Sequence, residues 1–174
     1  MRVLALAGVV FVLVLAAAGC GGGSEPPAQA WADGVCGRIN DWEQELRDIV
    51  AAQGSGSVTE RAREKVDKAA SATDDLLNDL QKVGAPNTDS GEEAKAEVEA
   101  LAQSTKDRID RIRTQAENAQ GTSDVLQLAA DVSAEFDAAR EEARTTFDKI
   151  SNLDPSGELR DGIESSEACD QLTS

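Results

Sequence analysis

The residues of this chain with the most chemical potential are three cysteines, at positions 20, 36 and 169. A thiol can be alkylated, can pair with a second thiol, or can act as a nucleophile or metal ligand. The sequence contains no histidine and no tyrosine. The lack of histidine excludes Ser-His-Asp and Cys-His catalytic arrangements and histidine-containing zinc sites. We therefore expect modification or pairing of the cysteines.

Carboxylate chemistry is the remaining catalytic alternative, because the chain carries 33 acidic residues. Such catalysis needs two acids that face each other across a cleft, and no pair stands out in the sequence. The acidic loops around Asp89 and Asp154 lack the Asp-x-Asp-x-Asp-Gly arrangement of calcium-binding loops. We expect a protein that is not an enzyme and that holds no metal or other cofactor.

Cys20 ends a segment that is typical of a bacterial lipoprotein signal peptide. One basic residue, Arg2, precedes an apolar run, and the small residues Ala18 and Gly19 lead to the cysteine. The apolar stretch Val3–Ala18 is shorter than the roughly 20 residues of a membrane-spanning helix. In lipoproteins of this kind the thiol receives a thioether-linked diacylglycerol. An uncleaved anchor and a cleaved, unlipidated signal peptide are the alternatives.

The signal peptide that ends at Cys20 predicts where the protein resides, and the residues after it predict how the domain is held there. Residues 21–27 form a Gly-rich tether that extends at most about 25 Å. We expect a signal peptide at 1–19, a lipidated tether at 20–27 and one helical-bundle domain at 28–174. The lipid anchor would hold this domain at the extracytoplasmic face of the bacterial cell membrane. The net charge of −16 repels nucleic acid, so an envelope protein is the more plausible macromolecular partner.

Helices are predicted throughout the remainder of the chain. Ala, Glu, Asp, Arg and Leu dominate, and no alternating run of β-branched residues occurs. Apolar residues three or four apart, separated by Gly and Pro breaks, predict helices at about 28–53, 57–83, 90–119, 124–151 and 157–172. Two capping boxes are predicted, one at Ser57 and Glu60 and one at Ser90 and Glu93.

Four long helices with short connections predict an all-α, antiparallel up-down four-helix bundle with a short fifth C-terminal helix. The stripe predicted to be buried on the first helix is Trp31, Val35, Ile39, Trp42, Leu46, Ile49 and Val50. The corresponding stripe on the fourth is Leu128, Val132, Phe136, Ala139, Ala143, Phe147 and Ile150. Aromatic residues on such a stripe are usually core rather than a ligand site. The many alanines predict close helix packing with little space for a ligand.

Cys36 and Cys169 are expected to form a disulfide, because an even pair in an exported protein usually does. In the predicted bundle, the end of the fourth helix lies beside the start of the first, which brings the two cysteines together. A redox-active pair is the alternative, but it normally requires close spacing and an electropositive setting. Both cysteines are surrounded by acidic residues in the sequence.

Three segments carry a resemblance to known proteins: Cys20 with its Gly-Gly-Gly-Ser tether, Trp31–Cys36, and Ala168–Leu172. In these segments the chain resembles lipid-anchored helical-bundle proteins of high-GC Gram-positive bacteria. The resemblance implies location and fold but no mechanism, since most such proteins have no assigned activity. We expect a non-catalytic lipoprotein that acts as an acidic helical interaction or structural module. The alternative is a lipid or small-molecule carrier with a hydrophobic site between helices.

Overall fold

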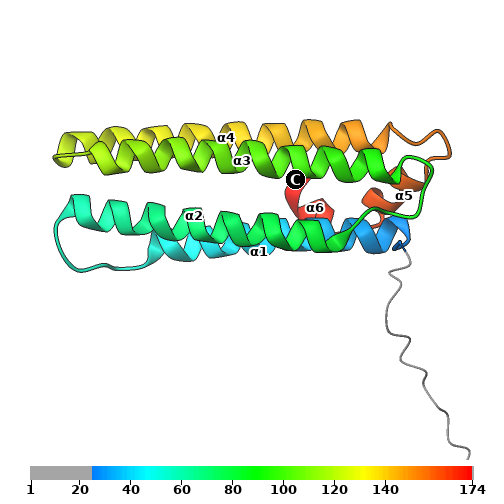
Figure 1. Cartoon of the computed structure of the whole chain (residues 1–174), viewed down its shortest axis with the longest axis horizontal. Helices are drawn as coiled ribbons and strands as arrows, with labels where there is room; N and C mark the ends of the chain where they lie inside the picture. The colour runs from blue at the N-terminus through cyan, green and yellow to red at the C-terminus, as the bar shows by residue number, and fades with distance from the viewer. Residues whose placement is uncertain (1–24, 174) are drawn as a thin grey trace, which may run out of the picture.

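The computed structural model describes residues 25–173, and the regular structure in this range is entirely helical. Cys20 and the predicted signal peptide lie outside the described residues. The helices are α1 (Ala28–Ala51), α2 (Val58–Val83), α3 (Gly91–Asn118), α4 (Thr122–Ser151), α5 (Glu158–Glu164) and α6 (Glu167–Thr173). Figure 1 shows α1 and α2 in one layer and α3 and α4 in a second. Within this range, no helix combines the length and apolar character needed to cross a membrane.

The two predicted capping boxes have different outcomes. The box at the start of α2 is confirmed, because the Ser57 hydroxyl accepts a hydrogen bond from the Glu60 N–H and the Glu60 carboxylate accepts one from the Ser57 N–H. The hydrogen bonds that the Glu60 carboxylate accepts from the Ser57 N–H and the Ser57 hydroxyl lower the pKa of Glu60. The prediction for Ser90 is wrong, since its hydroxyl donates to the Leu153 carbonyl at 3.1 Å and makes no cap bond. Here a tertiary contact between two loops outcompetes the local cap.

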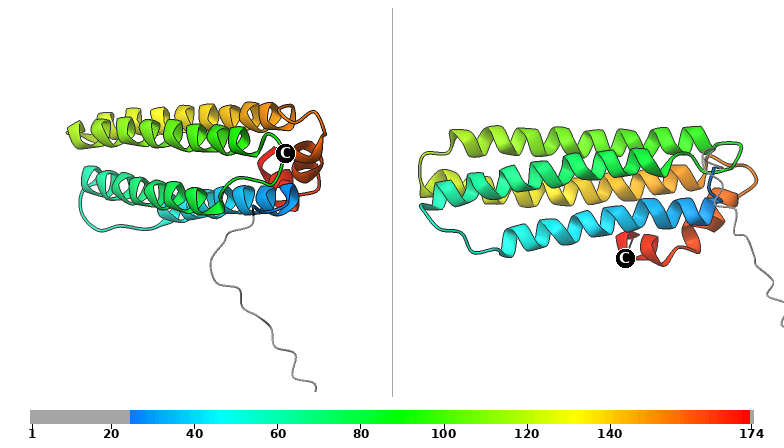
Figure 2. Two further views of the ribbon diagram at one scale, coloured as in Figure 1. Left: turned by 45° about the vertical axis from the view of Figure 1, so that its right-hand side comes forward. Right: turned by 60° about the horizontal axis from the view of Figure 1, so that its bottom comes forward.

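The single C-terminal helix predicted at 157–172 is in fact two helices of seven residues each, α5 and α6. Two serines cause the break. The Ser165 hydroxyl donates to the Asp161 carbonyl at 2.6 Å, and the Ser166 hydroxyl accepts from the Cys169 N–H at 3.3 Å. Ser166 thus caps the start of α6, as serine does at many helix N-termini. The turn lays α6 beside α1, as Figure 2 shows.

The predicted disulfide between Cys36 and Cys169 is confirmed and fastens α6 to α1. The two Cα atoms lie 5.0 Å apart, and both cysteines are buried. Beside it, the Asn40 amide donates to the Ala168 carbonyl at 2.8 Å. α5 also lies close to α1, because a Cβ at Gly162 would stand 2.7 Å from the Ala28 carbonyl carbon. Only glycine permits this approach.

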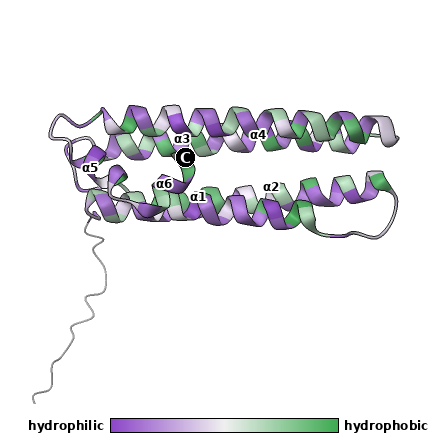
Figure 3. Cartoon of the chain, turned by 180° about the vertical axis from the view of Figure 1, so that it is seen from behind, coloured by the Kyte–Doolittle hydropathy of each residue, from purple (hydrophilic) through white to green (hydrophobic). Residues whose placement is uncertain are grey.

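Two clusters of buried residues make up the core, one at each end of the molecule. The larger cluster lies where α1 begins and α5 and α6 pack, and it includes Trp31, Val35, Cys36, Leu76, Val98, Phe147, Leu159 and Cys169. The smaller cluster, at the opposite end, draws on α2, α3 and α4 and comprises Ala70, Ile109, Ile112, Ala116 and Leu128. Figure 3 shows hydrophobic and hydrophilic residues interleaved along every long helix, as amphipathic helices require. The buried residues of α1, from Trp31 to Leu46, all belong to the larger cluster.

Reduction of the disulfide is predicted to destabilise the fold without abolishing its helices. The bond closes a loop with a sequence separation of 133 residues, and we expect its loss to lower the free energy of unfolding by about 2–4 kcal/mol. Urea unfolding of residues 25–174, followed by far-UV circular dichroism with and without dithiothreitol, measures the difference. The double variant Cys36→Ser/Cys169→Ser is the control and should not respond to the reductant. An unchanged midpoint for the reduced wild type would contradict the prediction.

Candidate functional site

The buried stripe predicted on α4 is wrong in its middle. The structure buries Leu128, Phe147 and Ile150, whereas Val132, Phe136, Ala139 and Ala143 are only half-buried. The end of the stripe on α1 differs in the same way. Ile49 is half-buried and the Val50 residue is 65% exposed. The half-covered parts of both stripes border a common edge between α1 and α4, which we call the α1/α4 seam.

The seam exists because α1 and α4 do not pack directly against each other. Within the described residues, no Cα atom of α1 comes within 8 Å of a Cα atom of α4, although α1–α2, α2–α3 and α3–α4 all make such approaches. At one end of the seam, α6 contacts both helices. In the middle, the rings of Trp42 and Phe136 stack, with centroids 6.1 Å apart and planes at 4°. The two rings therefore connect α1 and α4, whose backbones do not approach each other closely.

Trp42 is held in place by a chain of hydrogen bonds. Its indole N–H donates to the Thr73 hydroxyl at 3.1 Å, and that hydroxyl donates to the Ala69 carbonyl at 2.8 Å. Trp31 is positioned separately, with its indole N–H on the Gly84 carbonyl at 3.1 Å. Both tryptophans are buried, as the sequence predicts. Of the two, Trp42 stands at the seam, where its ring stacks on Phe136.

An apolar groove occupies the seam on the side away from α6. It holds about 360 Å³, and a smaller apolar hollow of about 60 Å³ lies behind the Trp42–Phe136 pair. The groove is lined by Leu46, Ile49, Val50, Ala62, Lys65, Val66, Ala69, Ile109, Ile112, Val125, Leu128, Ala129, Val132, Ser133 and Phe136. The alanine-rich stripes predict little space for a ligand, and the hollow beside Trp42 is indeed small, whereas the groove is open to solvent. The lining comes from all four long helices, of which α1 and α4 make no close backbone approach to each other.

A polar hollow of about 410 Å³ occupies the seam next to α6. It is lined by Asn40, Asp41, Glu43, Gln44, Arg47, Arg140, Arg144, Gln171 and Leu172. We call its three basic residues, Arg47, Arg140 and Arg144, the arginine mouth. The Glu43 side chain, 15% exposed, lies between two of them: its Oε2 is 3.3 Å from Arg47 Nη1 and 3.7 Å from Arg140 Nη2. Basic side chains thus converge on one hollow of a strongly acidic protein.

The three spaces along the seam adjoin one another. The polar hollow shares Glu43, Arg140 and Leu172 with the small apolar hollow. The small hollow in turn shares Phe136 and two isoleucines of α3 with the groove. The seam therefore runs from a charged mouth beside α6, past an aromatic pair, to an apolar groove at the far end.

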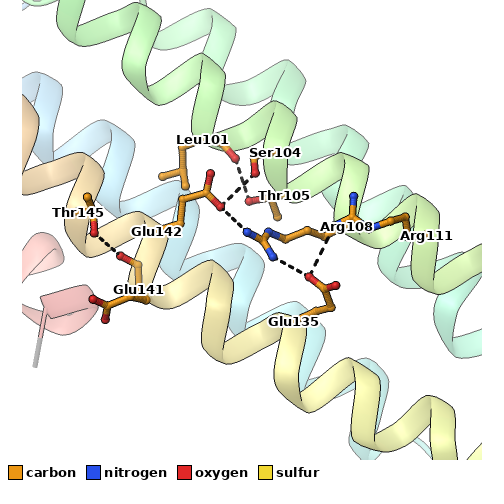
Figure 4. A network of polar contacts seen from close by, with 9 residues as sticks. All are labelled: Leu101, Ser104, Thr105, Arg108, Arg111, Glu135, Glu141, Glu142 and Thr145. Atoms are coloured by element: carbon orange, nitrogen blue, oxygen red, sulfur yellow. Dashed lines mark hydrogen bonds and ion pairs between the residues drawn. The ribbon is translucent and has the colours of Figure 1, made fainter.

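A polar clamp joins α4 to α3 (Figure 4). Arg108 of α3 binds Glu135 at 2.7 Å and Glu142 at 2.8 Å, so one guanidinium joins two turns of α4. The Ser104 hydroxyl also donates to Glu142, at 3.0 Å. Hydrogen bonds to Glu135 and Glu142 raise the pKa of Arg108 further above its ordinary value. The guanidinium therefore stays charged at every physiological pH.

Comparison of the chain with protein-family models, curated proteins and solved structures finds no match. The function must therefore be argued from the seam itself.

Some of the site was visible in the sequence and some was not. Arg140 and Arg144 are four residues apart, which places them on one side of a helix. No sequence signal brings Arg47 to them, because that meeting depends on how α1, α4 and α6 are arranged. The sequence analysis did not identify these arginines as functional residues. In residues 25–173, no group of three or more Cys, Asp or Glu residues is arranged to hold a metal ion.

The clamp is predicted to contribute to stability more than its position near the surface suggests. We expect Arg108→Gln to lower the free energy of unfolding by about 1–2 kcal/mol, because it leaves two half-buried carboxylates without their shared cation. Arg111→Gln is the matched control. The Arg111 side chain is 58% exposed and lies 3.7 Å from Glu135, so its loss should cost less than about 0.5 kcal/mol. Urea unfolding measures both, and equal effects would refute the clamp.

Proposed function

We propose that this protein is a non-catalytic, lipid-anchored carrier of the bacterial cell envelope that holds a lipid or another apolar small molecule in the α1/α4 seam. The observation that carries the proposal is the groove of about 360 Å³ with an almost wholly apolar lining. Small-molecule sites commonly have volumes of about 300–1,000 Å³ and are lined by hydrophobic and aromatic side chains. The sequence alone favours an interaction module over a carrier, and the open seam supports the carrier instead.

The proposed arrangement is an antiparallel up-down bundle in which one of the four long edges is not closed. The close approaches of α1 to α2, α2 to α3 and α3 to α4 support it. The missing approach of α1 to α4 leaves the fourth edge, where the ligand would enter between helices. Bundle cores are common places for ligand sites built from side chains on facing helices.

The proposed anchor and the groove would lie at opposite ends of the domain. The described chain begins immediately before α1, at the end where α5 and α6 pack, as Figure 1 shows. The groove is built from the last residues of α1 and the first half of α4, at the other end. A helix as long as α2, with 26 residues, spans about 40 Å. A lipid on Cys20 would thus hold the domain by one end and leave the groove facing away from the membrane.

An acidic helical interaction module with an envelope protein as its partner is the second candidate. Two large apolar residues favour it, because Val50 is 65% exposed and Leu126 is 69% exposed. Val50 lines the groove, and Leu126 directly follows Val125, which also lines it. Exposed apolar surface beside a groove is a common feature of protein-binding sites. A partner helix and a small ligand would compete for the same surface.

Binding of a neutral apolar probe tests the carrier. We expect N-phenyl-1-naphthylamine to gain fluorescence when it binds residues 25–174, which contain every described helix. Ala129→Trp, which fills the groove, should weaken this binding at least about tenfold. Ala130→Trp is the matched control, since Ala130 is exposed and does not line the groove, and it should change binding little. Equal binding by both variants would mean that the probe sits elsewhere.

Membrane fractionation tests the proposed lipid anchor. The full chain should be found in the membrane fraction of the expressing bacterium, because the diacylglycerol on Cys20 holds it there. Cys20→Ala should release it into the medium or stop its processing. The double variant Cys36→Ser/Cys169→Ser should remain with the membrane, since these thiols form the disulfide. Unchanged fractionation of Cys20→Ala would contradict lipid anchoring.

A further inference from the structure

We propose that the Phe136 ring closes the inner end of the groove and limits the length of the ligand, which is a molecule with a single alkyl chain of about ten carbons. This inference rests on the proposed function, because it assumes that an apolar ligand occupies the groove. It adds the size of the ligand and the residue that determines this size.

Phe136 stands between the groove and the small apolar hollow. It lines both spaces, together with Ile109 and Ile112. Trp42 lines the hollow but not the groove, so the indole lies behind the phenyl ring as seen from the groove. The two rings stack with their planes at 4°, and the Trp42 indole N–H is fixed by the Thr73 hydroxyl at 3.1 Å. The Phe136 ring is therefore a wall with a buried support.

The distance from the outer end of the groove to this wall limits the length of the alkyl chain. Val50 stands at the outer end and follows Trp42 by eight residues on α1. At a rise of 1.5 Å per residue, this separation is about 12 Å. A fully extended alkyl chain advances about 1.25 Å per carbon. About ten carbons therefore reach from Val50 to the stacked rings.

The volume of the groove gives a similar limit. A methylene group occupies about as much space as a water molecule in the liquid, which is about 30 Å³. The groove of about 360 Å³ therefore has room for about twelve methylene groups. One alkyl chain of this size fills the groove, whereas a lipid with two long alkyl chains exceeds it.

The polar groups of the lining favour entry with the tail first. Among the described residues that line the groove, Lys65 alone is charged, and its ammonium group donates to the Val50 carbonyl at the outer end. The Ser133 hydroxyl is already engaged, because it donates to the Ala129 carbonyl at 3.2 Å. A polar head group thus remains at the outer end, in contact with water, and the tail points toward Phe136.

Loss of the ring should join the groove to the small hollow. The hollow of about 60 Å³ has room for about two methylene groups, in addition to the space that the ring itself leaves. Each methylene group that moves from water to apolar surroundings strengthens binding about fourfold. Phe136→Ala should therefore favour longer alkyl chains by more than about tenfold.

Competition photolabelling of the full-length protein in phosphatidylcholine vesicles tests the inference. The photoprobe is a ten-carbon alcohol that carries a diazirine and a terminal alkyne, and the competitors are 1-decanol and 1-tetradecanol. Mass spectrometry identifies the labelled peptides. The measured quantity is the concentration of tetradecanol that halves labelling, divided by that of decanol. Because the vesicles are the same, comparison of this ratio between variants cancels differences in partitioning.

Phe136→Ala should lower the ratio by at least about tenfold relative to the wild type. Val132→Ala is the matched control, since Val132 lines the groove but not the hollow. It widens the groove in front of the wall, so both alcohols should be affected alike and the ratio should stay the same. If Phe136→Ala does not fold, Phe136→Leu replaces it, and this smaller truncation should lower the ratio at least about twofold.

Refilling the hollow tests whether the longer tail enters it. Ala139 lines the hollow but not the groove, so Phe136→Ala/Ala139→Trp should return the ratio to that of the wild type. Phe136→Ala/Ala138→Trp is the matched control, because Ala138 is exposed and lines neither space. Its ratio should remain as low as that of Phe136→Ala.

Three results would overturn the inference, and they are distinguishable. If Phe136→Ala or its substitute Phe136→Leu has the wild-type ratio while groove peptides are labelled, the ring does not limit the alkyl chain and the carrier stands. If Val132→Ala lowers the ratio equally, or Ala139→Trp does not restore it, the ring is not a wall in front of the hollow. If the photoprobe labels no peptide of α1 or α4, the proposed carrier function itself fails.

Discussion

The disulfide between Cys36 and Cys169 fixes the position of α6, and the rest of the open edge follows from that position. It holds α6 against α1 on the side where α4 would otherwise approach. Because α6 contacts both helices, α1 and α4 cannot close upon each other at that end. Farther along, the stacked rings of Trp42 and Phe136 fill the gap. Beyond the rings lies the apolar groove.

α4 shows how the fold maintains an open edge. This helix of 30 residues buries only Leu128, Phe147 and Ile150, which is little apolar area for its length. Hydrophobic packing alone would hold such a helix weakly, since most helical stability in proteins comes from the packed face. Arg108 compensates from α3 by binding Glu135 and Glu142. These ion pairs help to keep α4 packed on α3, although the apolar side of α4 is only partly covered.

The two ends of the domain have different properties as a result. The end with α5 and α6 is closed by a disulfide, a large buried cluster and a glycine that permits close backbone approach. The other end has a small cluster drawn from α2, α3 and α4. A ligand or a partner helix would bury the most apolar surface at this second end, because the large apolar residues Val50 and Leu126 are exposed there.

The sequence by itself determined the helices to within a few residues, the capping box at Ser57, and the pairing of Cys36 with Cys169. These features depend on local periodicity, caps and residue type, which a sequence contains directly. Only the tertiary structure decided that Ser90 binds Leu153 rather than capping α3, that Ser166 breaks the last helix, and that Val132 and Phe136 are half-covered. An apolar stripe indicates which side of a helix is suited to burial. Whether a neighbour covers that side depends on the spacing of helices, which is set by contacts between residues far apart in the chain.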